Sequence, residues 1–189
     1  VQVIMTRSDD TFLSLEERTT FANQNNADYF VSLHRNTGEG NGVETWIRSD
    51  ADDKAQSLAQ NIMDNLDAAG VSRNRGVKKG TQKSESKDYY VNLHTNMPAC
   101  IVELGFMNSP TDNQLFDANL DSYAKAIGDA VLKTYESYGK DGTDATESVE
   151  DVPSTEDQTS TETGTGTTGQ VLQNTQIENV ASLDATSHD

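Results

Sequence analysis

The chain contains 189 residues and carries a formal net charge of -17, with a pI near 4.3. This charge argues against a nucleic-acid binder, which needs a basic surface to meet phosphates, and against attachment to an anionic membrane by charge alone. No run of residues approaches the roughly 18 apolar positions of a transmembrane helix, so no membrane insertion is expected. A single cysteine, Cys100, excludes an internal disulfide framework.

The chain divides into two regions of different composition. Residues 1–139 alternate apolar strands with amphipathic segments, whereas residues 140–189 consist mainly of Asp, Glu, Ser, Thr and Gly. Such a composition buries too little apolar surface to offset the entropy that is lost on ordering. We therefore predict a folded domain over 1–139 and a disordered acidic linker or tail over 140–189.

The predicted elements follow from hydrophobic periodicity and from helix start and stop signals. Ser14 followed by Glu17 is a capping box, and apolar residues recur with helical spacing over 55–66 before Gly70, a typical helix stop. The segment 71–97 shows no clear element and is predicted to be a long functional loop. In chain order the predicted elements are strand 1–6, helix 14–25, strands 28–34 and 42–48, helix 52–69, strand 99–104 and helix 121–138. This alternation predicts an α/β fold with a mostly parallel sheet flanked by helices on both faces.

Two polar residues close otherwise apolar strands. His34 ends the strand 28–34, and Glu103 lies near the end of the strand 99–104. Ligands of open α/β sheets bind beyond the carboxyl ends of the strands, and a carboxylate in an apolar run is costly unless it is paired, hydrogen-bonded or bound to metal. We therefore predict that His34 and Glu103 lie side by side at the carboxyl ends of two parallel strands. Taken singly, His34 is explained as a hydrogen-bonded strand-end histidine and Glu103 as half of a buried salt bridge.

Short motifs follow one another in order along residues 1–138. The most specific are SLHRN at 32–36 and VELGF at 102–106, with GVET at 42–45 and RGVK at 75–78 between them. This series resembles the zinc-dependent N-acetylmuramoyl-L-alanine amidases, which cleave bacterial peptidoglycan. The resemblance implies the fold of that family, a phosphorylase/hydrolase-like α/β domain whose parallel-rich sheet lies between helices.

The resemblance also implies a role for each candidate residue. One Zn²⁺ would be held by two histidines and one glutamate, and His34 corresponds to the later histidine ligand. Glu103 corresponds to the catalytic carboxylate, which takes a proton from zinc-activated water and passes it to the leaving nitrogen. Arg75 and Asn36 are the expected substrate-binding residues. Arg75 would bind a carboxylate of the stem peptide, and Asn36 would orient His34 or its loop. Alternatively, Arg75 is a surface arginine on a loop, and Asn36 is a residue that only stabilises a turn.

The family pattern is incomplete in this sequence. The first histidine ligand of the family, in a Gly-His-Gly-Gly-like turn, and its glutamate ligand, on the helix that follows, have no counterpart here. We expect both to be encoded before Val1, which would also leave the sheet without one strand and its covering helix. A shortened relative that lost its metal is the alternative. Glu44 is a conceivable substitute ligand, although the family places no ligand there.

Three functions remain open at this point. The first is hydrolysis of the amide bond between N-acetylmuramic acid and the L-alanine of the stem peptide. The second is a catalytically silent module that binds the cell wall or regulates another hydrolase, and the third is a zinc peptidase acting on peptides without the sugar. For an amidase we expect peptidoglycan as the partner, through its glycan strand and stem peptide. We also expect a secreted or cell-wall-associated bacterial location and a wall-binding module beyond the acidic tail.

Overall fold

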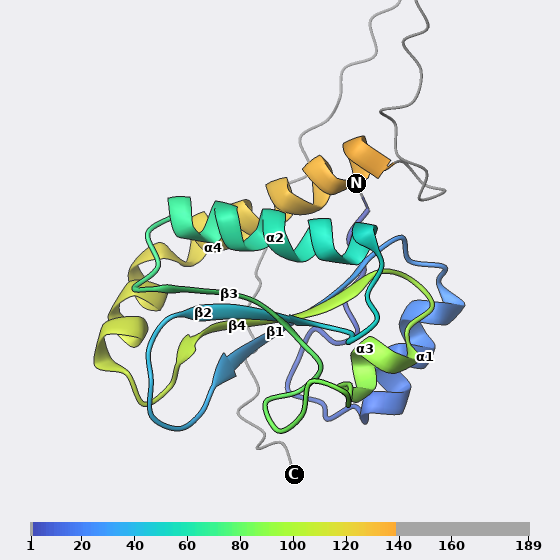
Figure 1. The fold of residues 1–189 in the computed structure, drawn as a ribbon, viewed down its shortest axis with the longest axis horizontal. Helices are drawn as coiled ribbons and strands as arrows, with labels where there is room; N and C mark the ends of the chain where they lie inside the picture. The colour runs from blue at the N-terminus through green and yellow to red at the C-terminus, as the bar shows by residue number, and fades with distance from the viewer. Residues whose placement is uncertain (1, 139–189) are drawn as a thin grey trace, which may run out of the picture.

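The computed structural model describes residues 2–138, which form an α/β domain (Figure 1). The acidic tail predicted for 140–189 lies outside the described residues. None of the helices within 2–138 is long and apolar enough to cross a membrane. In chain order the elements are α1 (Leu15–Gln24), β1 (Phe30–Asn36), β2 (Val43–Ile47), α2 (Asp53–Ala68), β3 (Asn74–Lys79), α3 (Tyr90–His94), β4 (Ala99–Phe106) and α4 (Pro110–Tyr138).

The four strands form one sheet in the order β1-β4-β2-β3. The pairs β1–β4 and β2–β3 are parallel, and the central pair β2–β4 is antiparallel. The prediction of a mostly parallel sheet is thus confirmed, with one antiparallel pairing added. The antiparallel pairing arises because only a short loop joins β1 to β2, and a short loop reverses the direction of the chain, whereas a parallel partner needs a long crossover.

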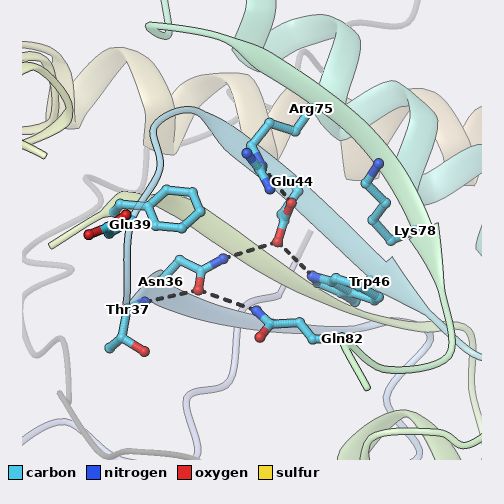
Figure 2. Close-up of a pocket in the computed structure, with 9 residues that line it drawn as sticks. Asn36, Thr37, Glu39, Glu44, Trp46, Arg75, Lys78 and Gln82 are labelled. Carbon is cyan, nitrogen blue, oxygen red and sulfur yellow. Dashed lines mark hydrogen bonds and ion pairs between the residues drawn. The ribbon is translucent and has the colours of Figure 1, made fainter. Parts of the chain in front are cut away.

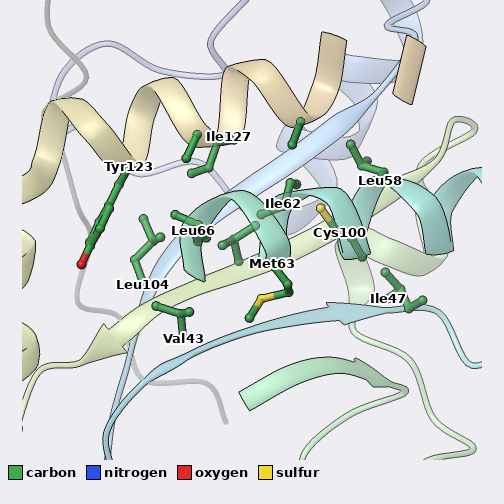
Figure 3. Close-up of a cluster of buried hydrophobic side chains, with 14 of the residues drawn as sticks. Val43, Ile47, Leu58, Ile62, Met63, Leu66, Cys100, Leu104, Tyr123 and Ile127 are labelled. Carbon is green, nitrogen blue, oxygen red and sulfur yellow. The ribbon is translucent and has the colours of Figure 1, made fainter. Parts of the chain in front are cut away.

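Helices cover both faces of the sheet, as predicted. Helices α2 and α4 lie together on one face, and α1 and α3 lie on the other (Figure 1). The larger core, under α2 and α4, includes Val43, Ile47, Leu58, Ile62, Met63, Leu66, Cys100, Val102, Leu104 and Ile127 (Figure 3). The smaller core, under α1 and α3, contains Ala22, Phe30, Trp46, Val91, Ala99 and Ile101.

Local signals explain where the first two helices begin and end. Ser14 caps α1 with the full capping box to Glu17, and the side chain of Asp52 accepts the Ala55 N–H at the start of α2. Gly70 follows α2 with a φ of 90°, a conformation that glycine adopts without strain. Each cap satisfies backbone donors that the first turn leaves unpaired, so these helices could be predicted from the sequence.

Three predictions about the elements differ from the structure. The strand predicted for 1–6 is wrong, because residues 2–14 contain no strand; Val3 is 78% exposed, and this segment is not paired into the sheet. The segment 71–97 is not a plain loop, since it contains β3 and α3. Hydrophobic periodicity does not predict β3, because this edge strand has a single large apolar residue, Val77. The helix predicted for 121–138 is the second half of α4, which starts earlier and is interrupted at Asn119.

Candidate active site

Three titratable side chains form a row across the middle of the sheet. In the parallel pair β1–β4, His34 lies opposite Glu103, and in the antiparallel pair β2–β4, Glu44 lies opposite the same Glu103. Directly opposed residues of neighbouring strands point to the same face of a sheet. The predicted neighbourhood of His34 and Glu103 is therefore present, and Glu44 joins it from the third strand.

Glu103 is a buried carboxylate with an unsatisfied oxygen. Its residue exposure is 6%, and its Oε2 atom has no hydrogen-bond partner among the described residues. Burial raises the pKa of Glu103 from its usual value near 4.5 to about 7, and the negative charge of Glu44 adds to this shift. On the neighbouring strand, His34 Nε2 lies 2.8 Å from the hydroxyl oxygen of Ser32. A buried group with a spare acceptor and a pKa near neutrality is suited to taking up and releasing a proton.

Glu44 is the centre of a hydrogen-bond network (Figure 2). Its Oε1 atom accepts hydrogen bonds from Asn36 Nδ2 at 3.0 Å and Trp46 Nε1 at 3.1 Å, and its Oε2 atom forms an ion pair with Arg75 Nε at 2.7 Å. The Glu44 residue is only 2% exposed. Both carboxylate oxygens are therefore engaged by protein donors, in contrast to Oε2 of Glu103. Glu44 is thus an anchor for its neighbours rather than a substitute metal ligand.

The network places Arg75 and Asn36 on the wall of an open pocket. The pocket has a volume of about 350 Å³ and is lined by Asn36, Thr37, Glu39, Glu44, Trp46, Arg75, Lys78, Gln82 and Phe106 (Figure 2). The guanidinium carbon of Arg75 lies 5.0 Å from the ring centroid of Phe106. Asn36 bonds to Glu44 through its amide nitrogen, and its oxygen accepts hydrogen bonds from Thr37 N and Gln82 Nε2. Both residues predicted for substrate binding thus face this pocket.

Sequence reasoning missed the network around Glu44 and the pocket beside it. The network depends on the antiparallel β2–β4 pairing, which sets Glu44 opposite Glu103, and on β3, which carries Arg75. One signal was present in the sequence: Glu44 and Trp46 alternate with the apolar residues Val43 and Ile47, so the polar face of β2 could have been read as a site wall.

The described residues do not assemble a complete metal centre. Within 2–138, no group of three or more His, Cys, Asp or Glu side chains is arranged to hold a metal ion. Cys100 does not contribute a reactive thiol either, because it is fully buried in the larger core and burial raises its pKa to about 12.

The raised pKa of Glu103 predicts how the stability of the metal-free protein depends on pH. Between pH values of about 4.5 and 7 the folded state keeps a proton on Glu103 that the unfolded state releases, so stability falls as the pH rises through this window and is flat above it. Glutamine does not titrate, so the free energy of unfolding of Glu103→Gln should fall by about 2 kcal/mol less between pH 5 and pH 8 than that of the unaltered protein. Urea unfolding of both proteins in EDTA at these two pH values measures the difference. Parallel pH profiles would contradict the burial of a titrating carboxyl group.

Comparison with known proteins gives consistent results. The family model described as N-acetylmuramoyl-L-alanine amidase matches residues 1–133. The chain is 36% identical over 138 residues to YqiI of Bacillus subtilis (strain 168), covering 71% of this chain and 63% of YqiI. It is 32% identical over 138 residues to the N-acetylmuramoyl-L-alanine amidase LytC of the same organism, covering 70% of this chain and 26% of LytC. The chain therefore spans less than two thirds of the length of either relative.

Solved structures show the same fold. The crystal structure of an N-acetylmuramoyl-L-alanine amidase from Clostridium difficile 630 is similar with a TM-score of 0.66 and 33% sequence identity, covering 73% of this chain and 74% of that chain. Cwp6 from Clostridium difficile is similar with a TM-score of 0.64 and 30% identity, covering 71% of this chain and 22% of that chain. The likeness extends over the domain that carries His34 and Glu103.

Proposed function

Because the chain belongs to the N-acetylmuramoyl-L-alanine amidase family, we propose that it hydrolyses the amide bond between N-acetylmuramic acid and the L-alanine of the peptidoglycan stem peptide. The observation that carries this proposal is the unpartnered, buried Oε2 atom of Glu103 on the strand beside His34. Leaving a buried polar atom without a partner costs free energy, so its retention favours a functional role. The printed names of LytC and of the Clostridium difficile protein support the same activity.

In this proposal Glu103 moves the proton that hydrolysis requires. Its carboxylate takes a proton from the water that attacks the lactyl carbonyl carbon, and the carbon–nitrogen bond then breaks. The same carboxyl group delivers the proton to the departing amino group of L-alanine, so that Glu103 ends the reaction in the ionised form in which it began. A pKa of about 7 leaves Glu103 substantially ionised near neutral pH, and it can still protonate a leaving nitrogen.

His34 fits one ligand position of a zinc centre. Imidazole nitrogen is a common zinc ligand, and the neighbouring Glu103 Oε2 offers an acceptor to a water molecule beside it. When bound, Zn²⁺ supplies an acidified water molecule. A catalytic zinc centre uses three protein ligands, and residues 2–138 bring no such set together.

The pocket beside Glu103 is suited to the peptide part of the substrate. Arg75 is half-buried, is held by Glu44, and presents a cation to a stem-peptide carboxylate. Asn36 supports the pocket wall through Glu44 and Gln82. Peptidoglycan as substrate implies a secreted or cell-wall-associated bacterial location.

The test is product analysis of digested peptidoglycan. The protein is incubated with purified peptidoglycan and Zn²⁺, and the soluble products are identified by mass spectrometry. Free stem peptides that begin with L-alanine, together with glycan strands whose lactyl groups carry free carboxyls, are expected. Cleavage elsewhere in the peptide would indicate a peptidase. Binding without product would favour a silent wall-binding module.

A further inference from the structure

A second cation, Lys78, lies beside Arg75 on the β3 wall of the pocket (Figure 2). Residues 75 and 78 would point to opposite faces of a regular strand. Here the register between β2 and β3 shifts, so that two steps along β2 from Val43 to Thr45 match three steps along β3 from Asn74 to Val77. This bulge brings Arg75 and Lys78 to the same side.

The bulge depends on Gly76. This residue has a φ of 79°, in the region that favours glycine, and a side chain there would be strained even though the space around it is open. Beyond the bulge the alternation resumes, and Val77 and Lys79 line a different surface beside α2. β3 therefore presents two cations to the pocket and keeps Lys79 away from it.

The two pocket cations have different partners. Arg75 is fixed by its ion pair with Glu44 and by its position over the ring of Phe106. Lys78 is half-buried, and among the described residues it has no hydrogen-bond or ion-pair partner. Glu44, the buried carboxylate of the same pocket, already accepts from three donors. Glu39 also lines the pocket, but it lies on the side opposite Lys78 and forms no ion pair with it (Figure 2). In a chain with a net charge of -17, a pocket cation that no carboxylate of the described residues pairs with indicates a site for an anion.

We infer that Lys78 is a specificity-determining residue, which together with Arg75 binds a free carboxylate of the stem peptide in preference to the corresponding carboxamide. This inference rests on the proposed function for the identity of the ligand. A carboxylate forms charge-assisted hydrogen bonds with an ammonium and a guanidinium group, whereas a neutral carboxamide forms weaker ones. Glu103 is not among the pocket residues, so this subsite holds a part of the peptide away from the bond that is cut.

Trp46 provides a direct measurement of binding. It is the only tryptophan of the chain, and its indole lines the pocket. The probes are N-acetylmuramoyl-L-alanyl-D-glutamate and N-acetylmuramoyl-L-alanyl-D-isoglutamine, which differ in one carboxylate against one carboxamide. We expect the carboxylate probe to change Trp46 fluorescence with roughly tenfold tighter binding than the carboxamide probe.

Matched variants separate the role of Lys78 from general charge effects. Lys78→Met should reduce the preference to about twofold or less, whereas Lys79→Met, which removes the same charge from the next residue on the other face, should keep it. Thermal unfolding of both variants verifies that they are folded. Equal binding of the two probes by the unaltered protein, or a preference that survives Lys78→Met, would overturn the inference.

Product analysis with the same two probes distinguishes this inference from the proposed function. Release of L-alanyl peptides from both probes at equal efficiency would support the amidase and overturn the carboxylate preference. A Lys78-dependent binding preference without any release would support the subsite and contradict hydrolysis.

Discussion

Replacing Glu103 by glutamine should reduce release of stem peptides by a factor of about 10²–10⁴, because an amide cannot accept the proton of the attacking water. The protein should stay folded, since the substitution keeps the shape of the side chain and removes a buried carboxyl group whose pKa is raised to about 7. Zinc content should also be unchanged if Glu103 moves protons and does not bind the metal. The measurements are product release by mass spectrometry, zinc content by atomic absorption and thermal unfolding.

A matched control is Glu16→Gln, which makes the same chemical change at an exposed position in α1 and should leave activity as it is. Unaltered activity of Glu103→Gln would show that the proton is carried by another group. A parallel loss of zinc and activity would instead make Glu103 a ligand. Because these outcomes differ in zinc content, the experiment separates the two roles that an active-site carboxylate beside a histidine can have.

The central pair of the site could be predicted from sequence because its signals are local. His34 and Glu103 each follow an apolar run, and the parallel pairing of β1 with β4 sets them opposite each other, although both strands continue beyond them to Asn36 and Phe106. The helix caps at Ser14 and Asp52 are equally local, since each side chain bonds within the first turn of its own helix. In these cases the residues that determine the structure are close together in the chain.

The rest of the site depends on pairings between distant segments. The network of Glu44 requires β2 to lie antiparallel to β4, and the cation pair requires a bulge in β3, whose sequence has too few apolar residues to reveal a strand. The opposite difference is found at the predicted strand 1–6, where the sequence suits a strand but residues 2–6 are not paired into the sheet. Strand propensity describes how well a segment fits a sheet, and pairing decides whether it joins one.

Asp112 holds together the loops that frame the site. It lies near the start of α4 and is only 4% exposed. Its Oδ2 atom accepts hydrogen bonds from the backbone N–H groups of Gly42 at 3.0 Å and Phe106 at 2.8 Å, and its Oδ1 atom accepts one from the Ser72 hydroxyl. One carboxylate therefore ties the loop before β2, the segment before β3 and the end of β4 to the same helix.

Asp112→Ala should destabilise the protein by about 3–5 kcal/mol, because it leaves two buried N–H groups and a hydroxyl group without their acceptor. Asp112→Asn should cost less, since the amide oxygen can still accept from Gly42 and Phe106. Asp121→Ala, an exposed position in the same helix, should change stability by no more than about 0.5 kcal/mol. Urea unfolding at pH 7 measures all three variants. A loss below about 1 kcal/mol for Asp112→Ala would show that water or another group replaces the carboxylate. A large loss would show that Asp112, a residue outside the pocket, stabilises the position of Phe106 and therefore the pocket wall against which Arg75 packs.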